Sequence, residues 1–311
     1  MLKFIFTDID DKEITLTDCI SVSVNMEENV PAHDLSVTFA YRDVPEFVTV
    51  TMLNEREILF TGIVDEQIRE CSAKGDFLKL NCRSMAAKLL DNESVPISYT
   101  HPSVDVILRN HAKPFSVYCE NSSDDTYFGT QTVAKGSSNW QAVEDFSKNM
   151  YHNKPIVSEL GLLCFDNPKK DVTTVFSNIS DGVRFFEFCE QRKRCEEISA
   201  IRIKAVNSAG YHMLIENKDA CDRKIQRERY LNAVFTNTPA IYAHNMIKNS
   251  RKKAYTVTLS AVGCHISSFL SNAVVKLSQD KTLDSLYVSA VRYNLSADGD
   301  ITTLTLKRKE V

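Results

Sequence analysis

Hydrophobic and polar residues alternate along the first quarter of the chain. Phe4 and Phe6 begin the pattern, and runs at residues 20–24, 35–39 and 48–50 repeat it. A period of two indicates strands that bury one face. Short strands at close spacing, with polar turns between them, predict a small barrel or sandwich. A helical composition at residues 84–90 then closes the unit, and a first β-barrel domain is expected over residues 1–90.

A helical period appears in the middle of the chain. Ser103 is placed to cap a helix that Pro114 stops. Ser138 begins a second helix in a capping-box arrangement with Gln141, and Trp140 lies in its apolar stripe, where a core role is expected. Strand candidates follow, at residues 155–157, 160–165 and 172–176. Residues 91–190 are therefore predicted to form an α/β domain.

The β pattern returns from about residue 191. Residues 198–206 and 211–216 read as strands, and a helix begins at Thr238-Pro239 and runs to about Arg251. Residues 255–262 read as a further strand. A second β-barrel domain is therefore expected over residues 191–311, with a helical insertion at about 217–253.

An internal repeat connects the two ends of the chain. Residues 59–83 align without gaps with residues 283–307, at an offset of 224, so that Gly75 falls on Gly299 and Leu80 on Leu304. A unit used twice suggests a pseudo-symmetric building block. The expected fold class is α+β, mainly β, with two similar small β-barrel domains that flank or enclose the α/β domain.

Each copy of the repeat follows a strand-like run and a polar turn. The runs are residues 47–52 and 273–277, and the turns consist of Asn54, Glu55 and Arg56 in the first copy and Gln279, Asp280 and Lys281 in the second.

The order of these segments resembles a known family, the central baseplate hub proteins of contractile-tailed phages. The same fold is the N-terminal part of type VI secretion spike proteins. The resemblance rests on a strand, a turn, FTGIV, a long hairpin with a Gly-Asp tip, RSMAAKLLDN, SVDVILRNHAKPFSV, VAKGSSNWQAVEDFSKNM, KAYTVTLSAVG and LYVSAVRYNLSADGDITTLTLKR, in that order. Two positions depart from the pattern. CHISSFLSNA follows Gly263 where the family usually has a second glycine, and Leu286 stands where the first copy has Gly62.

The resemblance implies a structural role without catalysis. It implies a homotrimer in the virion tail or baseplate, assembled in the host bacterial cytoplasm, that joins the sixfold tail tube to the threefold spike. The implied partners are the tail tube protein, the spike protein, and the tape-measure and baseplate proteins. The equivalent turns 54–56 and 279–281 are our candidates for contacts with the tube or with a neighbouring subunit.

Composition narrows the alternatives. A net charge of −4 and a pI near 6.0 provide no basic field, so sequence-specific nucleic-acid binding is not expected. No window reaches the ~18 apolar residues of a membrane helix. Nine cysteines without a CxxC pair are expected to be free thiols, with Cys71, Cys82 and Cys164 acting as small hydrophobes in strands. The seven histidines are scattered, and no metal or cofactor is expected.

Two enzymatic alternatives stay open. FIFTDIDDKEIT resembles the nucleophile motif of haloacid-dehalogenase-type phosphatases, with Asp8 as nucleophile and Asp10 as acid/base, although Lys12 stands where these enzymes have Thr or Val. The second alternative is a tail-associated enzyme that degrades cell walls. Phosphate-binding glycine motifs and a nucleophile elbow are absent from the sequence, which favours the structural role.

Overall fold

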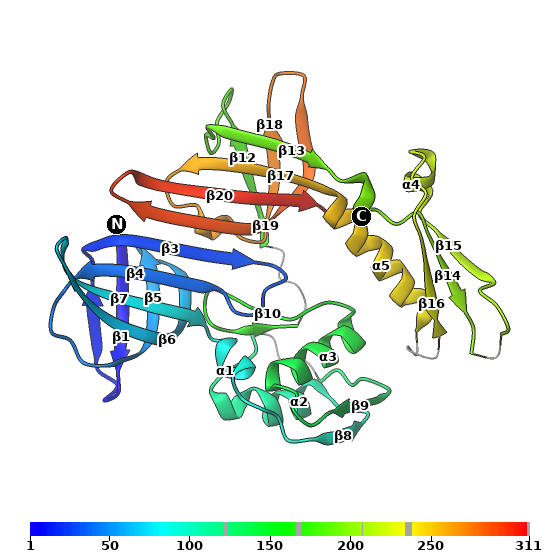
Figure 1. The fold of residues 1–311 in the computed structure, drawn as a ribbon, viewed down its shortest axis with the longest axis horizontal. Coiled ribbons are helices and arrows are strands. Elements are labelled where there is room, and N and C mark those ends of the chain that lie inside the picture. The colour runs from blue at the N-terminus through cyan, green and yellow to red at the C-terminus, as the bar shows by residue number, and fades with distance from the viewer. Residues whose placement is uncertain (121–123, 166–169, 207, 234–237, 310–311) are drawn as a thin grey trace. The chain divides into compact units, whose positions relative to one another are not determined.

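The computed structural model describes residues 1–120, 124–165, 170–206, 208–233 and 238–309. The chain divides into two compact units. Unit 1 comprises residues 1–170, 262–270 and 290–302, and unit 2 comprises residues 171–261, 271–289 and 303–311. Both units are built mainly from strands, with helices in addition (Figure 1), so the predicted class, α+β and mainly β, is confirmed.

Seven antiparallel strands form the first part of unit 1. They are β1 (Leu2–Asp8), β2 (Glu13–Leu16), β3 (Cys19–Glu27), β4 (Asp34–Ala40), β5 (Phe47–Asn54), β6 (Glu57–Ser72) and β7 (Gly75–Ser84). Their order in the sheet is β2-β1-β5-β6-β7-β4-β3. Figure 1 shows these strands curling around a common interior. The long β6–β7 hairpin lies at the centre of this order.

Aromatic side chains from the alternating positions fill this interior. The Phe4 ring meets Phe39 edge-on at 5.6 Å, and the Phe6 ring stacks on Phe47 at 4.6 Å. Such pairs add to the free energy of burial. The hydrophobic alternation at the first strand therefore gives the core that the sequence predicts.

Two residues of the alternating runs lie outside this core. Val48 and Ile20 are exposed, although the period of two places them inward. The pairing of β1 with β5 shifts register between Thr7 and Asp8, opposite Val48. The pairing of β3 with β4 shifts register between Cys19 and Ser21, where Ile20 lies. A β-bulge inserts one extra residue into a strand and turns the adjacent side chain to the other face. The period alone carries no sign of such an insertion.

The remaining part of unit 1 packs helices against short strands. It contains α1 (Ala87–Leu90), α2 (Val104–His111), α3 (Asn139–Tyr151) and a 3₁₀ turn (Lys113–Phe115), and it pairs β8 (Ile97–Thr100) with β9 (Thr130–Val133) and β10 (Ile156–Val157) with β11 (Leu163–Cys164). The Ser103 hydroxyl accepts the amide of Val106, and that of Ser138 accepts the amide of Gln141, so both predicted caps are confirmed. Trp140 is 3% exposed and lies in the core, as predicted.

Unit 2 contains a second antiparallel set of long strands. They are β12 (Lys170–Ser177), β13 (Glu187–Arg192), β17 (Tyr255–Val262), β18 (Ser271–Lys276), β19 (Thr282–Ser296) and β20 (Gly299–Arg308), in the sheet order β12-β18-β19-β20-β17-β13. The distal part of the β19–β20 hairpin, residues 290–302, belongs to unit 1. A 3₁₀ turn at Ile266–Ser268 also lies in unit 1, and another at Arg194–Glu196 follows β13.

A smaller layer lies between β13 and β17 in the sequence. It consists of β14 (Ala200–Lys204), β15 (Met213–Glu216), α4 (Lys218–Asp222), β16 (Glu228–Asn232) and α5 (Pro239–Ala254). β14 is the central strand, antiparallel to β15 and parallel to β16. Helix α5 runs along this sheet (Figure 1), and its Ala243 and Ile247 pack against Ile201 and Ile203. Strand β17 begins at the residue that follows α5.

The two sets of strands follow one topology. Numbered by sequence within each set, β1-β5-β6-β7-β4-β3 and β12-β18-β19-β20-β17-β13 are the same order. The agreement extends to a backbone hydrogen bond, because Tyr41 N donates to Asp76 O at 2.8 Å and Gly263 N donates to Asp300 O at 3.1 Å. Asp76 and Asp300 are related by the repeat offset of the sequence.

The repeated hairpins also agree at single positions. Gly75 and Gly299 both have positive φ, 136° and 113°, at the hairpin turn, where glycine avoids strain. Leu80 and Leu304 are both fully buried, as the repeat predicts. The two copies differ at Gly62, which aligns with Leu286. A side chain does not fit at position 62, since a Cβ there would lie 2.2 Å from the carbonyl oxygen of Arg83. Leu286, at the aligned position, is buried.

The prediction for the three strand cysteines is partly wrong. Cys82 and Cys164 are buried, but Cys71 is exposed. Cys71 lies near the end of β6, beyond the register shift between Val64 and Glu66, where the strand projects past the core. Apolar alternation identifies a face of a strand, and only the tertiary structure shows whether another element covers it.

Candidate functional site

The first candidate turn connects β5 to β6. Asn54 ends β5, and Glu55 and Arg56 are exposed in the turn, with a φ of 57° at Glu55. The chain start holds the turn, because the Met1 amino group donates to Asn54 Oδ1 at 3.3 Å and Glu55 N donates to Met1 O at 3.4 Å. The side chains of Glu55 and Arg56 are thereby displayed on a fixed backbone.

The second candidate turn connects β18 to β19, the equivalent place in unit 2. Gln279, Asp280 and Lys281 are all exposed. Leu277 N donates to Lys281 O at 2.9 Å and closes the turn, and Lys281 Nζ lies 3.9 Å from a carboxylate oxygen of Glu190. The two triplets therefore occupy the same place in the two strand orders, which suits a surface that is used twice.

The two aspartates of the phosphatase-like motif form a turn. Asp8 Oδ1 accepts the backbone amides of Asp10 and Lys12, each at 2.9 Å, and Asp10 is exposed beside Lys12. Strand β1 lies antiparallel between β2 and β5, so its end does not open into the parallel-sheet crevice that suits a nucleophile. No group of three or more His, Cys, Asp or Glu residues in the described part of the chain could hold a metal ion. The arrangement gives Asp8 a structural task.

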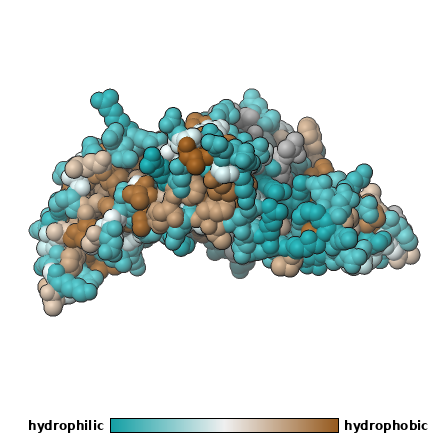
Figure 2. All heavy atoms as spheres, turned by 90° about the horizontal axis from the view of Figure 1, so that it is seen from above, coloured by the Kyte–Doolittle hydropathy of each residue, from teal (hydrophilic) through white to brown (hydrophobic). Residues whose placement is uncertain are grey.

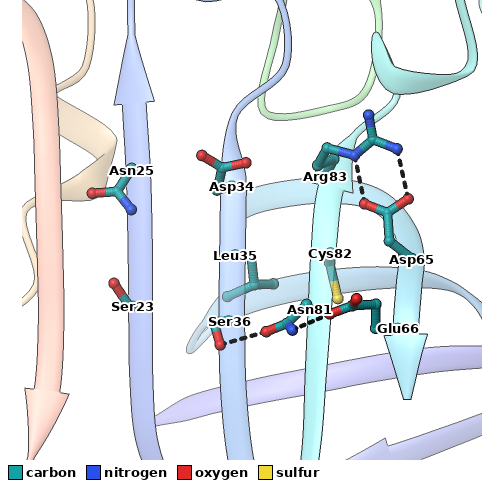
Figure 3. A pocket seen from close by; sticks show the side chains of 10 residues that line it. All are labelled: Ser23, Asn25, Asp34, Leu35, Ser36, Asp65, Glu66, Asn81, Cys82 and Arg83. Carbon is teal, nitrogen blue, oxygen red and sulfur yellow. Dashed lines mark hydrogen bonds and ion pairs between the residues drawn. The ribbon is translucent and has the colours of Figure 1, made fainter. Parts of the chain in front are cut away.

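A polar concavity of about 410 Å³ lies on strands β3, β4, β7 and β6 of unit 1. Figure 3 shows Ser36, Asn81 and Glu66 turned toward one another from neighbouring strands, and Arg83 turned toward Asp65. Its lining consists of Ser23, Asn25, Asp34, Leu35, Ser36, Asp65, Glu66, Asn81, Cys82 and Arg83.

Hydrogen bonds connect these side chains across the strands. Ser36 Oγ donates to Asn81 Oδ1 at 2.9 Å, and Asn81 Nδ2 donates to Glu66 Oε2 at 2.6 Å (Figure 3). Arg83 donates from Nε and from a terminal nitrogen to the Asp65 carboxylate, at 2.6 and 2.9 Å, and it also donates to Asp91. A bidentate arginine–carboxylate pair fixes both side chains in one geometry.

The charges of the concavity follow from these contacts. The hydrogen bond from Arg83 lowers the pKa of Asp91. Partial burial raises the pKa of Asp34, with Arg83 opposing the effect and Asp65 adding to it. Burial also raises the pKa of the Cys82 thiol to about 12, so the thiol stays protonated near neutral pH and is a poor nucleophile. The concavity is therefore equipped to bind polar groups and lacks an activated nucleophile.

A second feature of unit 1 is a strand junction. Residues 290–295 of β19 pair antiparallel with residues 22–27 of β3. Ser23 Oγ donates to Asn294 Oδ1 at 2.9 Å, and Arg292 Nε donates to Asn25 Oδ1 at 3.0 Å. Val291 and Tyr293 are buried at this junction.

The sequence predicts neither the concavity nor the junction. Polar residues at alternate positions, such as Ser23 and Asn25 or Asn81 and Arg83, are a weak sign of a polar strand face. No local signal marks which strands meet at the junction, because pairing between strands so far apart in the sequence depends on the whole fold.

Hydrophobic residues also reach the surface. Figure 2 shows them in several patches among hydrophilic residues on the face that it displays. The most exposed include Phe128, Val95, Ile9 and Val262. No helix in the described part of the chain is long and apolar enough to cross a membrane.

Comparisons with known proteins identify the fold. No family model and no curated protein match the sequence. Among solved structures, a tail protein from Neisseria meningitidis MC58 is 15% identical, with a TM-score of 0.74 over 98% of this chain and 96% of that chain. The prophage MuSo2 43 kDa tail protein from Shewanella oneidensis is 12% identical, with a TM-score of 0.76 over 99% and 98%.

A third match connects the fold to secretion machines. The E. coli c3393 protein, a component of the type VI secretion system, is 11% identical, with a TM-score of 0.54 over 94% of this chain and 74% of that chain. That protein is described as similar in structure to the T4 phage tail proteins gp27 and gp5. The chain thus has the fold of these phage tail proteins and of this component of the type VI secretion system, as the sequence resemblance predicts.

Proposed function

We propose that the protein is the central hub of a phage tail or of a related contractile injection machine. In this role it joins the tail tube to the spike as a non-enzymatic homotrimer. The fold shared with tail proteins supports the general role. The observation that carries the finer proposal is the strand order that occurs twice in one chain.

The repeat offers a solution to a mismatch of symmetry. A tube built from sixfold rings and a threefold spike need an adaptor that presents both symmetries. A closed cyclic oligomer fixes how many copies of each surface appear. Three chains with two similar β units each present six such units in a ring, whereas every other part of the chain appears only three times.

The proposal assigns the remaining parts of the chain to the same machine. The turns at residues 54–56 and 279–281 face the tube protein or a neighbouring subunit, and the spike, tape-measure and baseplate proteins are further partners in the virion tail. We also propose domains over residues 1–90, 91–190 and 191–311. In addition to residues 191–311, the second β unit uses β12 and β13 from the end of the middle segment, because these strands pair with β18 and β17.

Particle symmetry tests this proposal directly. Tails assembled from the gene cluster that encodes the chain are imaged by electron cryomicroscopy, and the copy number of the chain is measured by quantitative mass spectrometry. We expect three copies per tail and threefold symmetry at the hub, with the tube protein in rings of six as the internal reference. Six copies of this chain in a ring, or a position away from the junction of tube and spike, would contradict the proposal.

A further inference from the structure

Strand β19 pairs with three strands in the described part of the chain, β20, β18 and β3. One edge of β19 pairs with β20. On its other edge, residues 282–287 pair with β18, and residues 290–295 pair with β3. The distal part of the second hairpin is therefore covered on both edges.

The equivalent strand β6 lacks one of these neighbours. Its residues 57–63 pair with β5, which matches the pairing of β19 with β18. The repeat offset places residues 66–71 on 290–295. In the described part of the chain, residues 66–71 pair as a strand with β7 alone. No described strand lies along their other edge, where Gln67 Nε2 donates to Pro45 O and Gln67 Oε1 accepts the amide of Phe47. Arg69 is exposed there, whereas its counterpart Tyr293 is buried.

Strand β13 likewise has one edge without a paired strand in the described part of the chain. It occupies the place of β3 in the second strand order, and it pairs with β17 as β3 pairs with β4. The second edge of β3 holds residues 290–295. The second edge of β13 has no neighbour among the described strands.

From these observations we propose that residues 66–71 of one copy pair antiparallel with residues 188–193 of the next copy. The junction between copies would repeat the β19–β3 junction that the chain makes with itself. This inference rests on the proposed ring of three chains, and it names the surface that closes the ring. Six equivalent junctions result, three within chains and three between them.

The register of the proposed junction follows from the repeat. The matched bonds of Tyr41 and Gly263 place Leu35 on Val257. Val24 lies opposite Leu35, and Glu190 lies opposite Val257, so Glu190 takes the place of Val24. Tyr293 lies opposite Val24 in the chain's own junction, and Arg69 takes the place of Tyr293.

This register brings opposite charges together. Arg69 of one copy lies opposite Glu190 of the next, and three positions away Glu66 lies opposite Lys193. Opposite charges on directly paired residues stabilise a sheet, and like charges destabilise it. In the single chain Arg69 pairs with Asp76 on exposed surface, where an ion pair exchanges at little cost. The Glu190 side chain is 18% exposed and contacts Arg192, Lys281 and the Tyr255 hydroxyl, so the junction adds Arg69 to these contacts.

Backbone geometry agrees with the same register. Lys193 N donates to Ala254 O, so alternate residues of β13 bond β17, and the backbone groups of Phe188, Glu190 and Arg192 face the open edge. A two-residue turn lies between Ser72 and Gly75, so the backbone groups of Arg69 face the open edge of β6. The two outward sets of hydrogen-bonding groups thus lie opposite each other.

The polarity of the two junctions differs for a physical reason. The junction within the chain forms during folding and buries Val24, Val291 and Tyr293. The edges between copies stand in water before assembly, and charged residues on an edge prevent unspecific strand pairing. Arg69 and Glu190 serve both needs, because they keep each edge soluble and match each other when the ring closes.

A cross-link tests the register in assembled tails. Glu70 lies opposite the exposed native Cys189 in the proposed pairing. We expect Glu70→Cys tails, treated with diamide, to give covalent dimers and trimers of the chain on non-reducing gels. The matched controls are Glu70→Cys with Cys189→Ser, which removes the proposed partner, and Lys74→Cys at the exposed hairpin tip. Both controls should lose the covalent species.

A charge exchange tests the same contact without oxidation. Arg69→Glu and Glu190→Arg should each reduce the yield of assembled tails, and the double variant should restore it. Hubs with three copies that show neither the cross-link nor this rescue would overturn the proposed junction and leave the trimeric hub intact. Hubs with another copy number would overturn the proposed function, whatever the cross-link shows.

Discussion

His33, one of the buried histidines of unit 1, shows how a single side chain makes stability depend on pH. His33 is 2% exposed, and its ring lies edge-on to Phe269 at 5.2 Å. Its Nδ1 accepts the amide of Glu27, so the proton of the neutral ring is on Nε2, which has no hydrogen-bond partner among the described residues. Burial penalises the charged form and lowers the pKa to about 4.

The first prediction is that His33 lowers the free energy of unfolding in acid. The unfolded chain binds the proton near pH 6.5 and the folded chain only near pH 4, so the contribution to stability is complete above pH 6.5 and is lost as the pH falls toward 4. The loss amounts to about 3 kcal/mol. We expect His33→Gln to flatten the dependence of the unfolding free energy on pH in this window, measured by urea denaturation. His244→Gln, on the exposed face of α5, is the matched control and should keep the original slope.

A second prediction concerns the two leucines of the repeat. Leu80 and Leu304 fill the cores of their strand sets, and Leu→Ala at either should lower the unfolding free energy by roughly 2 to 5 kcal/mol through lost burial and a cavity. Ile301→Ala, on the exposed side of β20, should change it by less than about 0.5 kcal/mol. A neutral result at one leucine would show that the repeat does not have the same packing role in both places.

Among the secondary-structure elements, local signals set the starts of helices. Ser138 precedes α3, and its hydroxyl accepts the amide of Gln141 at 3.2 Å. Thr238 has the cap position of α5, but its side chain makes no cap hydrogen bond, although Pro239 begins the helix as predicted. A capping residue in the sequence thus marks the start of a helix more reliably than it marks a hydrogen bond.

The third prediction tests the cap of α3. Ser138→Ala should lower the unfolding free energy by about 1 kcal/mol, because one amide of the first turn loses its acceptor. Ser138→Asp keeps an acceptor and should retain most of the stability. Equal losses in the two variants, measured by thermal and chemical denaturation, would exclude the cap as the cause.

Across the whole molecule, the cysteine side chains differ in their exposure to solvent. Cys71, Cys189, Cys195 and Cys221 are exposed, whereas Cys82 and Cys164 are buried. Burial raises the pKa of both buried thiols, with Glu120 adding to the effect at Cys164, so reaction there requires unfolding.

The fourth prediction follows from this distribution. Titration with a thiol reagent in denaturant, without reductant, should count nine free groups. In native protein the four exposed cysteines should react fast, and Cys82 and Cys164 only at the rate of unfolding. Disulfides in freshly prepared protein, or rapid native reaction at Cys82, would contradict the arrangement of the strands around it.

Features that depend on near neighbours in the chain could be predicted from the sequence. The alternation around Phe4 and Phe6, the caps at Ser103 and Ser138, and the glycines at the two hairpin tips each follow from backbone preference or from one periodic face. The repeat also predicts that two segments far apart in the sequence form similar hairpins, because similar sequences favour similar local structure. These parts of the fold were therefore predictable.

Only the tertiary structure decides which strand edges and which strand faces are covered by other elements. Val48 and Ile20 point outward at bulges, and Cys71 is exposed. Strand β3 pairs with residues 290–295, which lie far from it in the sequence. The open edges of β6 and β13 and the polar concavity became visible for the same reason. A strand carries the same alternation whether or not another strand lies beside it, and its neighbour is selected by contacts from distant parts of the chain.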